Sequence, residues 1–331
     1  MDLLNKYKEE NMGYIARVTP EEVGVSSESM NRFFHRLRLH KLPMDSILLA
    51  RHGKLIGEVY YKPYTPKTLH RMYSISKSFT SIGIGLLIEE GRIKLEDPII
   101  RYFPDKLPKD LHPWIAAMTI EDMLKMQTCH LRTTYKEDLS KDWVESFFTT
   151  KPDHAPGTIF RYDTSSSHTL SALIERMTEK SMMDYLREKF LDEIGFSKEA
   201  YFLKDPFGIS MGGSGLVATP MDILRFALII MNYGKEGNRQ LIPAWYIKEA
   251  VSHQTDNFVE GAIYEETLGY GYQFWCIRHG GFACYGLGGQ LAICLPKQDF
   301  ICITTGDTTS IKGGNQYIYD SLYEEILPSI Q

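Results

Sequence analysis

The sequence predicts an α+β fold: an antiparallel sheet formed from both chain ends and flanked by helices, with an inserted, mostly helical lobe. Apolar β-type runs occur at residues 46–61 and again after residue 265, whereas the stretch between them is largely helical in pattern. The 331 residues are enough for a large core. We therefore predict one composite unit with its active site between two lobes. The sheet lobe takes residues 1–95 and 206–331, and the helical lobe takes residues 96–205.

The first sheet element is a hairpin at residues 46–61, where two apolar runs flank the turn "RHGK". A buried helix follows over residues 74–93, and Gly91 is a suitable C-terminal stop for it. This helix carries an apolar stripe and a stripe of small residues at helical spacing. The first stripe is Ile75, Phe79, Ile82 and Leu86, and the second is Ser74, Ser78, Ser81 and Gly85. We expect the apolar stripe to pack inward and the small stripe to leave room for an approaching group.

The later elements are predicted from the same signals. The strongest helix has Thr219 as its cap, Pro220 at its first position and Gly234 as its stop. Helices are predicted at residues 119–126, 218–234 and 317–330, and at least two more within residues 166–196. Strands are predicted at residues 270–277, 290–296 and 300–306.

Composition excludes several classes of protein. A net charge of -5 without a basic stripe argues against a nucleic-acid partner. No apolar run reaches membrane-spanning length, and the N-terminus lacks the apolar core of a secretory signal. The cysteines show no CxxC spacing and are odd in number, so we expect reduced thiols and a cytoplasmic protein. They are Cys129, Cys276, Cys284, Cys294 and Cys302.

One serine–lysine pair stands out in "RMYSISKSFTS". Ser74 precedes Lys77 by three positions, so a helix places both on one face, whereas Ser76 and Ser78 point elsewhere. A lysine kept neutral by burial can activate a serine hydroxyl for nucleophilic attack. The alternative is a capped helix with a surface lysine, because about one such spacing is expected by chance in a chain of this size.

Two further stretches could complete a site. Tyr162 lies at a loop–helix junction before a serine-rich run, where a phenol can transfer protons, although a packing tyrosine is the commoner case. In "CYGLGGQLAICLP", residues 284–296, three glycines in a β-type run indicate close backbone approach or a turn. Such bare backbone can bind substrate by strand addition and donate an N–H to an oxyanion.

In this order the three stretches resemble the S-x-x-K, Y-x-N and K-T-G motifs of the penicillin-recognising serine hydrolases, which have the β-lactamase/transpeptidase-like fold. The sequence around these motifs is similar to that of the class C β-lactamase and carboxylesterase branch of the family, including its 6-aminohexanoate-dimer hydrolase-like members. The resemblance extends from about residue 17 onward. It implies that Ser74 is acylated, that Lys77 helps to deprotonate it, and that Tyr162 is the second proton carrier.

The resemblance also implies substrate contacts. The backbone N–H groups of Ser74 and Leu287 would form the oxyanion hole, with Gly286 as the motif's glycine and Gln127 in a loop near the substrate. Two positions depart from the pattern: Thr164 replaces the motif's asparagine, and the motif's cation falls on Cys284 or Tyr285. Thr164 and Tyr285 would then contact substrate with different chemistry. Without the cation that recognises a β-lactam carboxylate, β-lactamase or D,D-peptidase activity is less expected.

A few other side chains could also take part in chemistry. His168 and His279 could serve a Ser-His site, but the sequence lacks a G-x-S-x-G elbow and we interpret both as structural. Asp307 is interpreted as a turn residue, and Trp275 as part of either cleft or core. No motif indicates a metal, and we expect no cofactor.

Two readings of the function follow from these residues. We expect a serine hydrolase that cleaves a small-molecule ester or amide through Ser74. The rival hypothesis, motivated by the changes at Thr164 and Cys284, is a catalytically silent binding or scaffold protein. Neither the substrate nor the oligomeric state is predicted.

Overall fold

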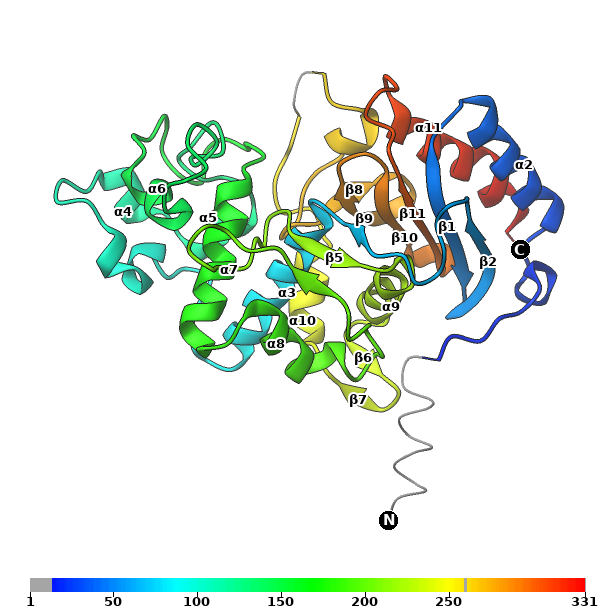
Figure 1. Cartoon of the computed structure of the whole chain (residues 1–331), viewed down its shortest axis with the longest axis horizontal. Coiled ribbons are helices and arrows are strands. Elements are labelled where there is room, and N and C mark those ends of the chain that lie inside the picture. Colours follow the sequence, from blue (N-terminus) through cyan, green and yellow to red (C-terminus); the bar gives the residue numbers. More distant parts are fainter. Residues whose placement is uncertain (1–13, 259–260, 331) are drawn as a thin grey trace, which may run out of the picture.

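The computed structural model describes residues 14–258 and 261–330. Its main element is a six-stranded antiparallel sheet with the order β2-β1-β11-β10-β9-β8. Strands from the two chain ends are neighbours, since β1 pairs with β11 and Leu48 lies opposite Ile303 (Figure 1). The predicted sheet built from both ends is thereby confirmed. Its strands are β1 (Met44–Arg51), β2 (Lys54–Tyr60), β8 (Trp275–Ile277), β9 (Gly281–Gly286), β10 (Gln290–Leu295) and β11 (Phe300–Gly306).

Helices cover both faces of this sheet (Figure 1). Side chains alternate along β1, so Ile47 and Leu49 join one hydrophobic cluster while Leu48 and Ala50 join the other. The first cluster includes side chains of α2 (Ser27–Leu39) and α11 (Gly314–Ser321), and the second includes those of α3 (Ile75–Glu89) and α9 (Pro220–Met231). The sheet therefore has no open apolar face along β1.

The middle of the chain is mostly helical, as predicted, and its helices α4 to α7 gather at the left of Figure 1. The domain boundaries at residues 96 and 205 stay a prediction. The helices here are α4 (Pro113–Ala117), α5 (Ile120–Leu124), α6 (Trp143–Thr149), α7 (Thr164–Thr178) and α8 (Met182–Leu186). Later in the chain, α10 (Ala244–Ala250) follows α9. Short strands form two smaller sheets: β3 (His70–Arg71), β5 (Leu216–Ala218) and β4 (Tyr201–Phe202), and β6 (Lys235–Glu236) with β7 (Arg239–Gln240).

The predicted hairpin and the strongest predicted helix are confirmed. His52 and Gly53 have the positive φ values of 52° and 69° that the tight turn between β1 and β2 requires. Thr219 caps α9 by accepting a hydrogen bond from the N–H of Asp222, with Pro220 at the first helical position. The capping signals in the sequence therefore fix where this helix begins.

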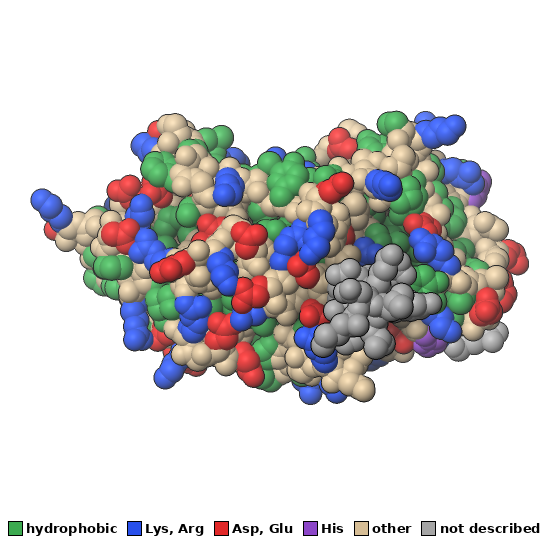
Figure 2. Space-filling model, turned by 60° about the horizontal axis from the view of Figure 1, so that its bottom comes forward, with side chains coloured by type: hydrophobic (Ala, Val, Ile, Leu, Met, Phe, Trp, Pro, Cys, Tyr) green, Lys and Arg blue, Asp and Glu red, His purple; other side chains and the backbone are tan. Residues whose placement is uncertain are grey.

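The surface shows no dominant charge of one sign on the face drawn in Figure 2, where acidic and basic side chains are interspersed. No helix in the described part of the chain is both long enough and apolar enough to cross a membrane. The N-terminal segment in which the sequence shows no secretory signal falls largely on residues 1–13, which lie outside the described residues.

The small-residue stripe of α3 is packed against other parts of the protein. The prediction that this face leaves room for an approaching group is therefore wrong beyond the first turn of the helix. Ser78 donates a hydrogen bond to the carbonyl of Gln273 at 2.9 Å, and the Ser81 hydroxyl lies 3.0 Å from that of Tyr246. Gly85 lies against the Tyr246 ring. Small residues here allow α10 to approach α3 closely, which is the ordinary use of such a stripe in a core.

This close approach predicts different costs at two glycines of α3. A methyl group at Gly85 would lie 2.3 Å from Cδ1 of the buried Tyr246 ring, whereas one at Gly83 would meet the terminal Cδ1 of Ile174 at 2.6 Å. Alanine gains about 1 kcal/mol of helix propensity at either position. We expect Gly85→Ala to lower the free energy of unfolding by about 1–3 kcal/mol through overpacking. Gly83→Ala should cost less, because the end of an isoleucine side chain moves more easily than a buried ring.

Urea unfolding of both variants measures the difference. An equal or larger loss in Gly83→Ala would show that the Tyr246 ring can move aside and that α10 is not held against α3 as closely as the structure indicates.

Candidate active site

The turn before α3 presents Ser74 at the helix N-cap. Tyr73, immediately before it, has a φ of 45°, a strained conformation for a bulky residue. Ser76 fastens this turn, because its hydroxyl donates to the carbonyl of Tyr73 at 2.5 Å and accepts from the N–H of Leu216 at 2.9 Å. The strained turn is thus tied to β5, and it leaves the Ser74 side chain half-buried rather than enclosed.

Lys77 lies under Ser74 with 1% of its surface exposed. Its Nζ is 3.2 Å from Oγ of Ser74, 3.3 Å from Oγ1 of Thr164 and 2.6 Å from the carbonyl oxygen of Gly213. Burial lowers the pKa of Lys77 to about 7, and the nearby carboxylate of Asp163 partly opposes that effect.

The hydrogen-bonding groups of a neutral Lys77 amine match those of its three neighbours. A neutral amine has two N–H donors and one lone pair. The two donors can serve the carbonyl of Gly213 and the hydroxyl of Thr164, which leaves the lone pair to accept the proton of Ser74. Lys77 is therefore placed to act as a base toward Ser74.

Tyr162 closes the site from above the lysine. Nζ of Lys77 is 4.9 Å from the centre of the Tyr162 ring, and an interaction with Ser74 lowers the pKa of Tyr162 against the effect of burial. Trp275 packs against the Tyr162 ring with 5.2 Å between centroids. Burial raises the pKa of Tyr162, so the phenol keeps its proton and can donate it. The structure thus brings Ser74, Lys77 and Tyr162 together, as the sequence predicts.

The N-terminus of α7 holds two groups beside Lys77. The fully buried carboxylate of Asp163 caps the helix by accepting from the N–H groups of Ser165 and Ser166, at 2.8 and 3.2 Å. Thr164 is the first residue of α7 and reaches Lys77 with its hydroxyl, in the place of the motif's asparagine. The cap fixes the helix start, so it also fixes where Tyr162 and Thr164 stand relative to the lysine.

The end of β9 approaches the turn before Ser74 very closely. A Cβ atom at Gly286 would lie 2.4 Å from the carbonyl oxygen of Met72, so only glycine fits there. Leu287, next along the chain, is exposed on the β9–β10 turn. Among the described residues, the backbone N–H groups of Ser74 and Leu287 donate no hydrogen bond. These two donors are therefore available to an oxyanion, and their role there stays a prediction.

The other predicted contacts are less closely tied to the nucleophile. Gln127 is half-buried, and its carbonyl accepts from the N–H of Gly157 at 2.8 Å; its contact with substrate stays a prediction. Tyr285 packs on Trp275 with 5.9 Å between ring centroids, and the charge of Glu266 adds to the effect of burial in raising the pKa of Tyr285. Trp275 itself is 8% exposed, so it forms a wall behind the two tyrosines rather than an open cleft surface.

The cation of the third motif has no substitute at either aligned position. Cys284 is buried, and burial raises the pKa of its thiol to about 12, so it is neutral at physiological pH. Burial likewise raises the pKa of Tyr285. All five cysteines are free.

The weighed alternatives have structural roles. Nε2 of His168 is 3.0 Å from the carboxylate of Asp205 in a buried pair, and the ring of His279 packs against Tyr323. Asp307 accepts from the N–H of Thr309, as a turn residue does. No group of three metal-binding side chains occurs in the described ranges.

Two neighbours of Lys77, Gly213 and Asp163, are absent from the predicted site. Gly213 is 136 positions away in sequence, and its partner Gly212 is held against α3 by a hydrogen bond from Thr80. The run "GGSG", which contains Gly213, is a sequence signal for close backbone approach. Asp163, directly before "TSSS", is a sequence signal for a helix cap.

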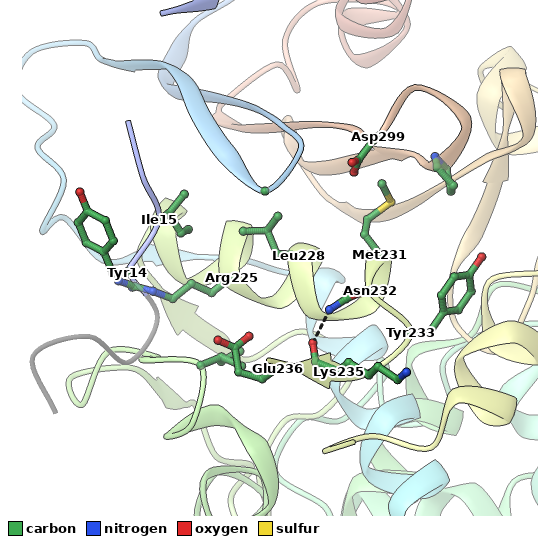
Figure 3. A pocket seen from close by; sticks show the side chains of 13 residues that line it. Tyr14, Ile15, Arg225, Leu228, Met231, Asn232, Tyr233, Lys235, Glu236 and Asp299 are labelled. Carbon is green, nitrogen blue, oxygen red and sulfur yellow. Dashed lines mark hydrogen bonds between the residues drawn. The ribbon is translucent and has the colours of Figure 1, made fainter. Parts of the chain in front are cut away.

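A larger cavity lies elsewhere. It has a volume of about 600 Å³ and opens beside α9, where Arg225, Leu228 and Met231 line one wall (Figure 3). None of the predicted site residues lines it. A smaller cavity of about 380 Å³ has among its walls Tyr73, the residue before Ser74, and Leu287, but not Ser74 itself.

Comparisons with known proteins found a matching family model and several relatives. The family model described as Beta-lactamase matches residues 30–306. A 6-aminohexanoate-dimer hydrolase of Paenarthrobacter ureafaciens is 24% identical over 296 residues, which are 80% of this chain and 73% of that protein.

Two solved structures share the fold. A Bacillus anthracis protein assigned as a 6-aminohexanoate-dimer hydrolase superposes with a TM-score of 0.75 at 21% identity, covering 96% of this chain and 87% of its own. The D-amino acid amidase of Ochrobactrum anthropi gives a TM-score of 0.69 at 18% identity, covering 90% and 99%.

Proposed function

The chain belongs to the Beta-lactamase family, and we propose from this that it is a serine hydrolase which cleaves an ester or a small amide through an acyl-enzyme at Ser74. One observation carries the proposal. The hydroxyl of Ser74 is 3.2 Å from the amine of Lys77, whose pKa burial lowers to about 7. An amine that is largely neutral at physiological pH can take the hydroxyl proton as the oxygen attacks a carbonyl.

The proton then has a path to the leaving group. Lys77 receives it from Ser74, while Tyr162, which keeps its own proton beside Ser74, gives that proton to the departing oxygen or nitrogen and recovers one from Lys77. The N–H groups of Ser74 and Leu287 stabilise the negative charge on the carbonyl oxygen. Water then attacks the acyl group by the reverse use of the same residues, and Ser74 regains its proton.

Esters and small amides fit this site better than β-lactams or cell-wall peptides. Cys284 and Tyr285 supply no positive charge to pair with a substrate carboxylate at the third motif. The names of two similar proteins, a 6-aminohexanoate-dimer hydrolase and a D-amino acid amidase, support an amide of a small amino acid as one substrate class. The occupant of the site is thus proposed to be a small molecule.

Peptide mapping by mass spectrometry tests the proposal. The wild-type protein is mixed with nitrophenyl esters, with matched anilides and with a fluorophosphonate, and then digested. We expect a mass gain equal to the acyl or phosphonyl group on the peptide that contains Ser74. If no reagent adds mass, while small ligands still raise the melting temperature, the silent binding protein is the better description.

A further inference from the structure

The turn between β9 and β10 carries Leu287, whose N–H is part of the proposed oxyanion hole. The next two residues, Gly288 and Gly289, have φ values of 80° and 91°, which glycine alone adopts readily. Glycine tolerates both signs of φ, so a peptide unit in such a turn rotates at little cost. A backbone donor beside these glycines therefore keeps a fixed direction only if other contacts hold the turn.

Every carbonyl of this turn accepts a hydrogen bond. The carbonyl of Leu287 accepts from Nε2 of Gln290 at 2.8 Å. The carbonyl of the first glycine accepts from the N–H of Thr308 at 3.0 Å, and that of the second accepts from Oγ1 of Thr304 at 2.7 Å. The N–H of Leu287, by contrast, donates no hydrogen bond within the described part of the chain. The turn is thus held by its carbonyls, which leaves this N–H for another acceptor.

Gln290 holds both peptide units of Leu287. The backbone of Gln290 pairs with Gly286 across the β9–β10 hairpin, which fixes the peptide unit that carries the Leu287 N–H. The side chain of Gln290 holds the next peptide unit, which carries the Leu287 carbonyl. The direction of the Leu287 N–H therefore depends on one residue of β10.

The side-chain amide of Gln290 is itself fixed in one orientation. Gln290 is 4% exposed, and at the end of β11 its Nε2 donates to the carbonyl of Gly306 at 2.9 Å while its Oε1 accepts from the Gly306 N–H at 3.2 Å. Together with the Leu287 carbonyl, these contacts use both amide donors and one acceptor. A glutamate at this position would set a carboxylate oxygen against two carbonyls, and a methionine would form none of these bonds. The contacts therefore select an amide.

We propose that Gln290 is a positioning residue for catalysis, which orients the Leu287 N–H toward the oxygen of the carbonyl that Ser74 attacks. The inference rests on the proposed hydrolase function, and it extends the oxyanion hole to a buried side chain behind the turn. Preorganised donors stabilise a developing negative charge because they need no reorientation during the reaction. Loss of the Gln290 side chain should therefore slow the reaction only where the charge develops on a good hydrogen-bond acceptor.

Two nitrophenyl esters of the same acid separate this role from a general structural one. One is an ordinary ester, and in the other, a thiono ester, sulfur replaces the carbonyl oxygen. Sulfur is a weak hydrogen-bond acceptor, so the thiono ester gains little from oxyanion donors. We expect Gln290→Met to lower kcat/KM by about 10- to 100-fold for the ordinary ester and by less than about threefold for the thiono ester. The rise of kcat/KM near pH 7 should stay in place, because Lys77 is unchanged.

Two further variants complete the experiment. Gln290→Glu keeps the size of the side chain and the acceptor for the Gly306 N–H but loses both amide donors. It should show the same selective loss, and it replaces Gln290→Met if that variant does not fold. Gln240 supplies the matched control, because its Nε2 likewise donates to two carbonyls, those of Tyr233 and Ile242, at 2.6 Å each. Gln240→Met should keep the wild-type ratio of the two rates.

An equal loss with both esters would make Gln290 a structural residue and overturn the inference, and so would unchanged rates with both. If the wild type hydrolyses neither ester, the hydrolase proposal itself fails. Hydrogen exchange in the peptide that covers residues 284–291 then decides whether the Gln290 side chain holds the turn. Faster exchange in Gln290→Met than in the wild type and in Gln240→Met supports that anchor, and equal exchange rejects it.

Discussion

Ser74→Ala is expected to abolish acylation by esters and fluorophosphonates while leaving the fold intact. Ser74 is half-buried and its hydroxyl contacts Nζ of Lys77, so the substitution deletes the nucleophile without orphaning a core group. Loss of a serine nucleophile costs about 10³- to 10⁶-fold in turnover in enzymes of this kind. We expect a melting temperature within a few degrees of the wild type, since half-exposed hydroxyls contribute about 1 kcal/mol or less.

A second serine on the same helix supplies the matched control. Ser81 is fully buried two turns along α3, and its hydroxyl is 3.0 Å from that of Tyr246. Ser81→Ala should lower the free energy of unfolding by about 1–3 kcal/mol, because the Tyr246 hydroxyl loses a buried partner. Its turnover should change little. Turnover that survives in Ser74→Ala and disappears in Ser81→Ala would remove Ser74 from the chemistry.

Local spacing explains why part of this site could be predicted from the sequence. Ser74 and Lys77 are three positions apart, so the helical repeat alone places them on one face once α3 is recognised. The two-residue hairpin turn and the Thr219 cap are likewise local, and both are confirmed. Tyr162 was assigned to the site only because the three motifs occur in the order known for the family. No local rule relates Tyr162 to Lys77, which lies 85 positions earlier.

Contacts between distant segments explain what the sequence did not predict. Gly213 reaches Lys77 because Thr80 holds the neighbouring carbonyl of Gly212, a pairing with no periodic signature. The small-residue stripe of α3 was misjudged for the same reason: whether such a stripe packs or stays open depends on α10, whose position is set by the tertiary fold. The sequence identifies Asp163 as a helix cap, but only the three-dimensional structure shows that its charge raises the pKa of Lys77.

The pH dependence of acylation is expected to follow Lys77. Burial lowers its pKa to about 7, and a base must be unprotonated to accept the Ser74 proton. We therefore expect kcat/KM to rise as pH increases through about 7 and to fall as pH drops below it. Lys77→Met should remove the base and reduce kcat/KM by about 10²- to 10⁴-fold. Rates measured from pH 5 to 9 on a neutral ester separate this from substrate titration.

A substitution at Asp163 tests whether the rise of kcat/KM with pH, the rising limb of the profile, reports the titration of Lys77. Its buried carboxylate raises the pKa of Lys77 against the effect of burial, so loss of the charge must lower that pKa further. Asp163→Asn keeps a capping side chain for α7, and the rising limb should move to lower pH. Asp205→Asn, which changes another buried carboxylate that pairs with His168, should leave the limb in place. A limb that stays fixed in Asp163→Asn, or moves to higher pH, would mean that another group titrates, and Lys77 would then be a charged positioning residue rather than the base.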